Sequence, residues 1–336
     1  MKGRLLLSFS TLALFASSAS AQQDRTSCPD GAATAGIPNA TMASQDACQK
    51  AIDLFKYMAP QLGTSITGGN ATLGQGSSLG GLGHFSIGIR VNGVQGSLPQ
   101  IQNVTPAVTG AQSTKFDTKT QLIPMPTADL AIGIFKGIPL ALTNVGGVDL
   151  LLSAAYLPEF DGDGVSVKVP DGSLKIGYGA RVGILQESLL VPGISVSYLR
   201  RDLPTVNIAA NAGNDSLVVD KLSLKTNAWR VVASKSILLF GLAAGFGQDK
   251  YESSADIHAY VTPPVGQPFA TDPVPLSQNI TRSNVFADLS INLLILKLTG
   301  EIGQVSGGTI NTFNTFSGKQ AADSRIYGSV GARFGF

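Results

Sequence analysis

Two short motifs in the first quarter of the chain contain residue types used in hydrolysis. The stretch Gly76-Ser-Ser-Leu-Gly80 matches the Gly-x-Ser-x-Gly pattern, in which a sharp strand-to-helix turn exposes a nucleophilic serine. Here the motif sits in a Gly/Ser-rich stretch with no strand before it and no helix after it, so we interpret it as a chance match. The second motif is the His-x-Ser pair His84 and Ser86, the residue types that a membrane-embedded lipid hydrolase uses.

The residues around His84 and Ser86 indicate whether this pair could act as a lipid hydrolase. From His84 to Asn92 the odd positions are apolar and the even positions are polar or glycine. A period of two is typical of a β-strand with one apolar face. Both residues fall on the polar face, whereas a phospholipase embedded in a membrane works at its lipid-facing surface. We therefore expect an ordinary pair that lines a polar interior, and the chain is predicted not to be an enzyme.

Charged residues recur on the polar faces of other alternating segments. Asp129 lies opposite the apolar residues of 128–134, and both Lys175 and Arg181 share the Gly-rich face of segment 174–184. Because charges are costly in lipid, these cations favour a face that lines a wet lumen. The residues predicted to line that lumen are His84, Ser86, Arg90, Asp129, Lys175 and Arg181.

These alternating segments indicate the fold class. The longest apolar run after the first 21 residues, Ile237 to Phe246, is strand-sized and shorter than the ~18 residues that a spanning helix needs. A chain that crosses a membrane with strands must close into a barrel, because open edges leave backbone groups unpaired in lipid. We predict an all-β, antiparallel transmembrane β-barrel over residues 83–336, with about 12 strands and with 10 or 14 as alternatives.

The connections between the segments support a barrel of the outer membrane. Short joints such as 233–236 alternate with long polar loops such as 160–172, 262–280 and 306–323. Outer-membrane barrels have short periplasmic turns and long extracellular loops. A soluble β-sandwich also alternates along its strands, but it explains the end of this chain less well.

The end of the chain has the pattern of an assembly signal. Ser329, Gly331, Phe334 and Phe336 lie on an alternating strand that closes with an aromatic residue. This resembles the terminal signal by which the barrel assembly machinery recognises outer-membrane proteins. An edge strand with an aromatic end is a template for strand pairing before the barrel closes. The machinery and the lipid bilayer are therefore predicted partners.

The start of the chain predicts export. Residues 1–21 combine Lys2 and Arg4, an apolar stretch, and the small-residue site Ala19-Ser-Ala21. These are the parts of a cleaved Sec-type signal peptide. With the barrel pattern, they place the protein in the outer membrane of a Gram-negative cell.

Residues 22–82 form a separate segment with a different pattern. Ala47, Ala51, Leu54, Phe55 and Met58 recur at steps of three and four, which predicts one amphipathic helix from about Ser44 to Pro60. A Gly/Ser/Thr-rich connector, residues 63–83, follows it. We expect the segment to plug the lumen or to cap its periplasmic mouth.

The two cysteines, Cys28 and Cys48, fall in this segment. In an oxidising compartment we expect a Cys28–Cys48 disulfide, since a metal site needs more ligands than two thiols. No residue set indicates a cofactor or a metal. Without Lys2 and Arg4 the basic and acidic residues balance at 22 each, so the mature chain has no basic excess for a nucleic-acid partner.

Several stretches resemble a known family. Residues 51–63 (AIDLFKYMAPQLG), Gly68-Gly-Asn70, 83–88 (GHFSIG) and Pro124-Met-Pro126 are similar to a set of uncharacterised outer-membrane barrels. In that set, a helix ending in a Tyr-x-x-Pro element leads into a barrel distantly similar to long-chain fatty-acid (FadL-type) channels. The resemblance covers most of the mature chain, and it identifies no binding residue.

Three functions follow. The preferred one is a porin-like passive channel or transporter for a small solute, and the resemblance implies that a hydrophobic solute is one option. The second is a non-transporting structural or surface-interaction barrel whose long loops bind a partner. The third and weakest is a membrane-embedded lipid hydrolase.

Overall fold

The structure, a computed structural model, describes residues 38–101, 107, 109–162, 165–262 and 268–335. The predicted signal peptide, Cys28 and Phe336 lie outside the described residues, so the signal peptide and the Cys28–Cys48 disulfide stay predictions. One helix, α1 (Pro38–Thr67), is followed by a segment without helix or strand, residues 68–84, and then by strands. The main strands are β1 (Phe85–Pro99), β3 (Thr118–Phe135), β6 (Gly147–Tyr156), β9 (Leu174–Leu185), β10 (Gly193–Asp202), β12 (Asp215–Ile237), β13 (Phe240–Val261), β15 (Val274–Leu293), β16 (Leu296–Ser306) and β18 (Arg325–Gly335).

Within the described residues these ten strands form a closed ring. β1 pairs with both β3 and β18, and the pairing continues through β6, β9, β10, β12, β13, β15 and β16 back to β18. Every pair is antiparallel. A closed ring leaves no strand edge unpaired. The predicted fold class is confirmed.

The ring has ten strands, which is one of the predicted alternatives and not the preferred count of 12. The count of 12 takes residues 206–211 as a wall strand and residues 237–247 and 251–261 as two strands, whereas the structure places 206–211 beyond the ring and joins the other two segments in β13. The alternating residues 206–211 form β11 (Val206–Ala212), which pairs with the end of β12 and with β8 (Val165–Lys168) beyond the ring. The other short strands are β2 (Lys115–Phe116), β4 (Ile138–Leu140), β5 (Thr143–Val145), β7 (Phe160–Gly162), β14 (Phe269–Ala270) and β17 (Thr315–Phe316).

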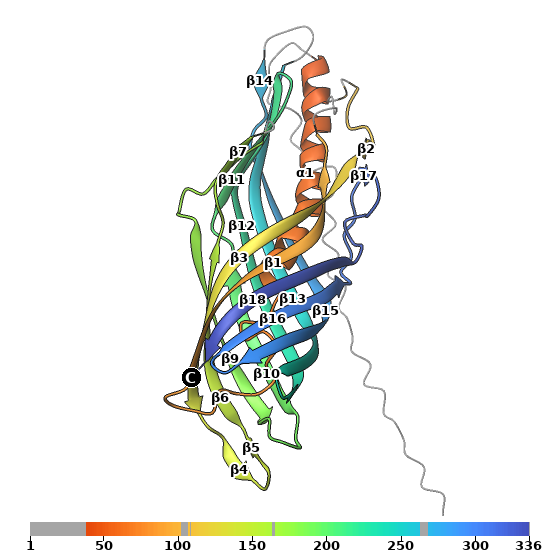
Figure 1. Cartoon of the computed structure of the whole chain (residues 1–336). Coiled ribbons are helices and arrows are strands. Elements are labelled where there is room, and N and C mark those ends of the chain that lie inside the picture. Colours follow the sequence, from red (N-terminus) through yellow and green to blue (C-terminus); the bar gives the residue numbers. More distant parts are fainter. Residues whose placement is uncertain (1–37, 102–106, 108, 163–164, 263–267, 336) are drawn as a thin grey trace, which may run out of the picture.

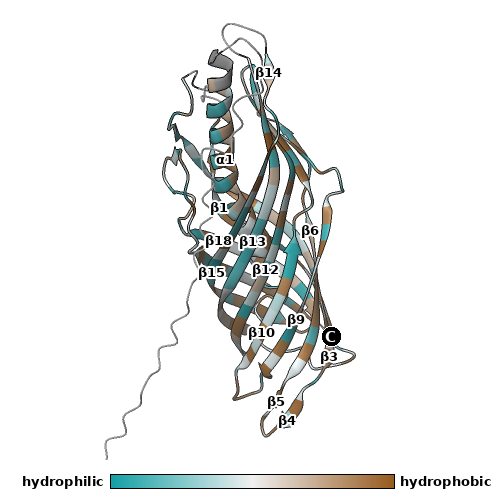
Figure 2. Cartoon of the chain, turned by 180° about the vertical axis from the view of Figure 1, so that it is seen from behind, coloured by the Kyte–Doolittle hydropathy of each residue, from teal (hydrophilic) through white to brown (hydrophobic). Residues whose placement is uncertain are grey.

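The strands turn their apolar face outward. Ile89, Val330 and Ile302 are 70%, 66% and 64% exposed, whereas their neighbours Arg90 and Ser329 are buried. Figure 2 shows hydrophobic and hydrophilic residues alternating along the strands. This distribution is the reverse of a soluble protein and is typical of a barrel wall in lipid. In the described part of the chain, no helix is long and apolar enough to cross a membrane.

The two ends of the barrel differ in their connections. At one end two residues join β12 to β13, and two residues join β15 to β16. This end also holds the beginning of β1 and the end of β18, which pair through Ser86 and Gly335. The connections that contain β11 and β14 lie at the opposite end, where the first turns of α1 also lie, whereas the β3–β6 connection with β4 and β5 lies at the first end (Figure 1). By the usual asymmetry, the short-turn end is periplasmic and the long-loop end faces outward.

A charge placed on the outer wall tests which face meets lipid. Val330→Arg is expected to lower the free energy of unfolding from lipid vesicles by about 2–4 kcal/mol, the cost of an arginine near the bilayer midplane. The control is Leu189→Arg in the β9–β10 turn, where the cost is about 0–1 kcal/mol because the site lies near the interface. Denaturant titration of both variants measures the difference. Equal losses would contradict a lipid-facing Val330.

Candidate functional site

The lumen of the barrel contains α1. The helix contacts β1, β3, β10, β12, β13, β15 and β18, which are spread around the ring. Its apolar side chains, including Ile52, Phe55 and Ile66, pack against Leu224 and Ile257 of the wall. The side chain of Tyr57 stacks on Phe316 with 3.8 Å between ring centroids. The helix is thus held from several sides within the barrel (Figure 1).

The helix extends beyond the predicted range of 44–60 at both ends. Pro60 was expected to end it, because proline lacks the N–H that bonds to the carbonyl four residues earlier. In the structure, Nε2 of Gln278 from the wall lies 3.5 Å from the Lys56 oxygen that Pro60 leaves unpaired. The hydroxyl of Thr64 donates to the Pro60 oxygen at 2.9 Å. The surrounding barrel therefore supports a proline that would break an isolated helix.

Wall side chains meet the carbonyl end of α1. Nδ2 of Asn92 donates to the oxygens of Thr64 and Ser65 at 3.2 and 2.6 Å. Nη1 of Arg201 lies 3.3 Å from the oxygens of Ile66 and Thr67 and 3.1 Å from that of Gly69.

Two further arginines donate to carbonyl oxygens at the end of α1 and in the residue that follows it. Nη1 of Arg90 donates to Gly68 O at 2.6 Å, and Nη2 of Arg230 lies 3.3 Å from Thr67 O. We call Arg90, Arg201 and Arg230 the arginine collar. The last carbonyls of a helix lack partners within the helix and carry a partial negative charge. The collar supplies both the donors and the opposite charge.

Residues 68–82, here called the strap, continue from α1 toward the periplasmic end. Their backbone N–H groups donate to carboxylates of the wall: Gly69 to Glu301 at 3.1 Å, Gly74 to Asp288 at 2.9 Å and Leu79 to Asp149 at 3.0 Å. The ammonium of Lys297 donates to Gly74 O at 2.6 Å. A strap rich in glycine can approach the wall closely. At Gly76, for example, a Cβ would lie 2.7 Å from the Ser234 nitrogen.

Little space remains between strap and wall. The cavities bordered by both have volumes of about 20 and 10 Å³. A cavity of about 10–15 Å³ on this measure holds one water molecule. At these two places, the space between strap and wall has room for about one water molecule and for no larger solute.

Four of the residues predicted to line the lumen are buried. Ser86, Arg90, Asp129 and Arg181 are 2–6% exposed. Arg90 pairs with Asp129, with Nε and Oδ2 2.5 Å apart. Arg181 pairs with Asp149 at 2.7 Å and its Nη1 donates to the Thr72 hydroxyl of the strap at 2.5 Å.

His84 and Lys175 differ from this prediction, because both are exposed. His84 precedes β1 at the periplasmic rim, and Lys175 is the second residue of β9 at the outer rim. In the alternating pattern, each falls on the same side as the lumen-facing residues. Each lies at a rim of the barrel, however, where the side chain is exposed. Near Ser86 the polar contact is Nη1 of Arg333 at 3.5 Å. The Gly76–Gly80 motif lies in the strap without the strand–turn–helix context of a nucleophile elbow.

Several lumen residues were missed in the sequence, although the alternation contains them. Arg201, Arg230 and Asp249 lie on inward positions of β10, β12 and β13, and Arg230 pairs with Asp249 at 2.5 Å. Tyr327 is also buried in the lumen and donates to Asn284 Oδ1 at 3.1 Å. Ser329 of the predicted assembly signal donates to Asn92 Oδ1 at 2.8 Å, whereas Phe334 points outward and is 45% exposed.

At the outer end, α1 is fixed by the long loops. Oδ2 of Asp53 accepts hydrogen bonds from N and Nδ2 of Asn314 in the β16–β18 connection, at 2.8 and 2.7 Å. Burial raises the pKa of Asp53 above its ordinary value, against the lowering effect of these bonds. Burial likewise lowers the pKa of Lys56. The carboxylate of Asp46 accepts from the backbone N of Ala107 and Gln112 in the β1–β3 connection at 2.7 and 2.8 Å.

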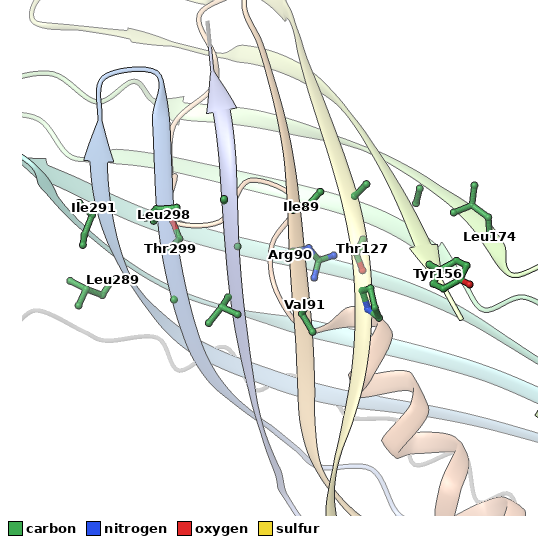
Figure 3. A pocket seen from close by; sticks show the side chains of 17 residues that line it. Ile89, Arg90, Val91, Thr127, Tyr156, Leu174, Leu289, Ile291, Leu298 and Thr299 are labelled. Atoms are coloured by element: carbon green, nitrogen blue, oxygen red, sulfur yellow. The ribbon is translucent and has the colours of Figure 1, made fainter. Parts of the chain in front are cut away.

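An apolar groove of about 810 Å³ lies on the outer wall (Figure 3). Small residues such as Gly300, Ala332 and Ala128 alternate there with larger ones such as Ile89 and Leu298. These outward residues belong to the surface that meets lipid. Arg90 and Thr299, which belong to the inner wall, also border the groove (Figure 3).

Comparisons with known proteins bear on the fold. No family model matches, and no curated protein matches. Among solved structures, the chain is similar to the Yersinia pestis attachment invasion locus protein Ail at 10% identity, covering 76% of this chain and 99% of that one, with a TM-score of 0.27. It is similar to the transport unit of the Escherichia coli autotransporter AIDA-I at 10% identity, covering 87% and 99%, with a TM-score of 0.37.

A third similar structure is the Ralstonia pickettii toluene transporter TbuX, at 11% identity, covering 82% of this chain and 97% of that one, with a TM-score of 0.25. The chain is a β-barrel of the outer-membrane type. At such identities no residue role is transferred.

The buried ion pairs of this wall predict a large difference between two aspartate variants. Asp149→Ala leaves Arg181 buried without a carboxylate and removes the acceptor of Leu79 N, so we expect a loss of about 3–5 kcal/mol in unfolding free energy. The matched control is Asp256→Ala, which breaks an exposed pair with Lys221 and should cost about 0–1 kcal/mol. Denaturant unfolding in vesicles measures both. Similar losses would contradict a closed, dry environment around Asp149.

Proposed function

We propose that this protein is a passive channel of the outer membrane whose lumen is closed by its own N-terminal segment, α1 plus the strap, here called the plug. The observation that carries the proposal is the contrast between wall and filling. The wall presents charged side chains such as Arg181, Asp149 and Asp288, while the plug is uncharged from Tyr57 to Leu82.

A charged wall remains wettable when its filling leaves. Polar interiors are typical of barrels that hold a water-filled channel. The strap is joined to this wall mainly by hydrogen bonds, such as those of Gly69 and Gly74 with Glu301 and Asp288. Water can replace such bonds, each of which contributes about 1.5–3 kcal/mol when one partner is charged. Release of the plug therefore opens a hydrated passage.

The wall composition also bears on the solute. A channel for hydrophobic solutes would present apolar side chains to its lumen. Around the strap the inward residues include Arg90, Asp129, Arg181 and Glu301, all buried. We therefore infer a small polar solute and not a hydrophobic one.

A second candidate function is a surface-interaction barrel. It is favoured by the outer end of α1, which the β1–β3 and β16–β18 connections hold through Asp46 and Asp53. This arrangement presents a fixed set of loops at the outer mouth. A barrel that never conducts would leave this candidate as the better one.

Two full-length variants test the channel. Gly63→Leu unseats the plug, because even a Cβ at Gly63 would lie 2.7 Å from the Tyr251 ring of the wall. Ser78→Cys with Gly183→Cys locks it, because a Cβ at Gly183 would lie 3.1 Å from Ser78 Cβ, close to the ~3.5–4.5 Å of a disulfide. In planar bilayers, Gly63→Leu should conduct more often than wild type. The oxidised lock should be silent, and reduction should restore wild-type behaviour.

The controls separate plug release from damage to the barrel. Met42→Leu changes a half-exposed position of the same helix and should conduct like wild type. Wild type and the single cysteine variants receive the same oxidant and reductant. Heat-modifiable migration in detergent verifies that each barrel is folded. If folded wild type, Gly63→Leu and the reduced lock all fail to conduct, the channel is wrong.

A further inference from the structure

The inner wall carries an excess of positive charge. Among the described residues of the ring, eight cationic side chains point inward or contact the strap: Arg90, Arg181, Arg201, Arg230, Arg282, Lys297, Arg325 and Arg333. The inward anionic residues are five: Asp129, Asp149, Asp249, Asp288 and Glu301. The plug does not correct this excess, because its charged residues are Asp46, Lys50, Asp53 and Lys56, two of each sign.

The excess of positive charge comes from arginines that have no carboxylate partner. Arg201, Arg282 and Arg325 are buried, and none has an ion pair within the described part of the chain. Arg282 donates instead to the oxygens of Ala322 and Asp323, and Arg325 to that of Gln320. Buried guanidinium groups without a counter-charge are costly.

Within the collar, Arg90 and Arg230 pair with Asp129 and Asp249, whereas Arg201 has the carbonyl end of α1 in place of a carboxylate in the closed state. Four carbonyl oxygens, from Ile66 to Gly69, lie within 3.3 Å of a collar nitrogen. They bring the partial negative charge of a helix C-terminus to the collar. They do not saturate it. In the described structure, Nη2 of Arg90 and both Nε and Nη2 of Arg201 are buried without a hydrogen-bond partner.

Departure of the plug removes these acceptors together. The three guanidinium groups of the collar then face an aqueous lumen against two carboxylates, those of Asp129 and Asp249, so one positive charge and several donors are left without a partner. Oxyanions match this need, because a guanidinium binds carboxylate or phosphate oxygens through paired N–H groups. Rings of arginine or lysine are also the arrangement found in anion and phosphate pores.

We propose that the opened lumen is anion-selective and that the arginine collar binds an oxyanion group of the solute at the position that the α1 carbonyls occupy in the closed state. This rests on the proposed channel function and names its substrate class. The solute and the plug then compete for one set of donors. An anionic solute thus favours the open state that transports it.

The sequence offers a matched pair of variants for the test. Arg201 and Arg200 are neighbours on β10 with the same charge and opposite faces. Arg201 is in the collar, whereas the Arg200 side chain is 36% exposed and pairs with Asp202 at 3.4 Å. The measurement is the reversal potential of full-length Gly63→Leu channels in a KCl gradient, followed by block of the current with inorganic phosphate.

We expect the reversal potential to have the sign of chloride permeation, and phosphate to reduce the current. Adding Arg201→Gln should move the reversal potential toward zero and weaken the phosphate block. Adding Arg200→Gln should change neither. Arg201→Lys keeps the charge but loses the planar pair of donors, so it should retain chloride selectivity and lose part of the phosphate block.

The possible failures are distinguishable. A conducting but unselective or cation-selective Gly63→Leu channel overturns the anion inference and leaves the channel standing. Equal effects of the Arg200 and Arg201 variants overturn the role of the collar. If Gly63→Leu does not fold, Gly68→Ala replaces it, since a Cβ there would lie 2.3 Å from Nδ2 of Asn92. Absence of conductance in both folded unseating variants and in wild type overturns the channel and its selectivity together.

Discussion

The contact between the carbonyl end of α1 and the arginine collar organises the interior of this barrel. A helix end buried without partners would be unstable, and so would three buried arginines. Here the arginines supply hydrogen-bond donors and the helix end supplies acceptors. Arg201 alone reaches the oxygens of Ile66, Thr67 and Gly69. The position of the helix along the barrel follows from this contact. The strap then continues from Gly69 to the beginning of β1 along a line of wall carboxylates.

Such an interior combines fixed geometry with reversible attachment. Arg90, Arg181 and Arg230 each pair with an aspartate of the wall, and these pairs remain when the plug leaves. The strap is attached mainly through its backbone, and backbone groups can exchange their partners for water. In the proposed channel, ten strands enclose a charged wall around a removable filling that has no net charge. The apolar outer surface, in contrast, serves the membrane.

The alternation of residues such as Ile89 and Arg90 was sufficient to predict the fold class and the inward polar face. Strand number was harder, because residues 206–211 alternate like a wall strand yet pair beyond the ring as β11. The range of α1 could not be read locally, since its continuation past Pro60 depends on Gln278, which is remote in sequence. The collar depends likewise on three strands and the helix end meeting in space. The alternating pattern shows that the three arginines face inward. It does not show that all three donate to carbonyl oxygens at the end of α1.

The central claim is that the plug opens independently of the wall. Native-state hydrogen exchange, resolved by peptide, measures this directly, since amides exchange according to the free energy of their local opening. If the plug opens by itself, the amides of Gly69, Gly74 and Leu79 exchange well before those of β13 and β15, although each of the three donates a hydrogen bond to a wall carboxylate. Exchange of strap and strands at one common rate would contradict it, because the plug would then be an inseparable part of the barrel core.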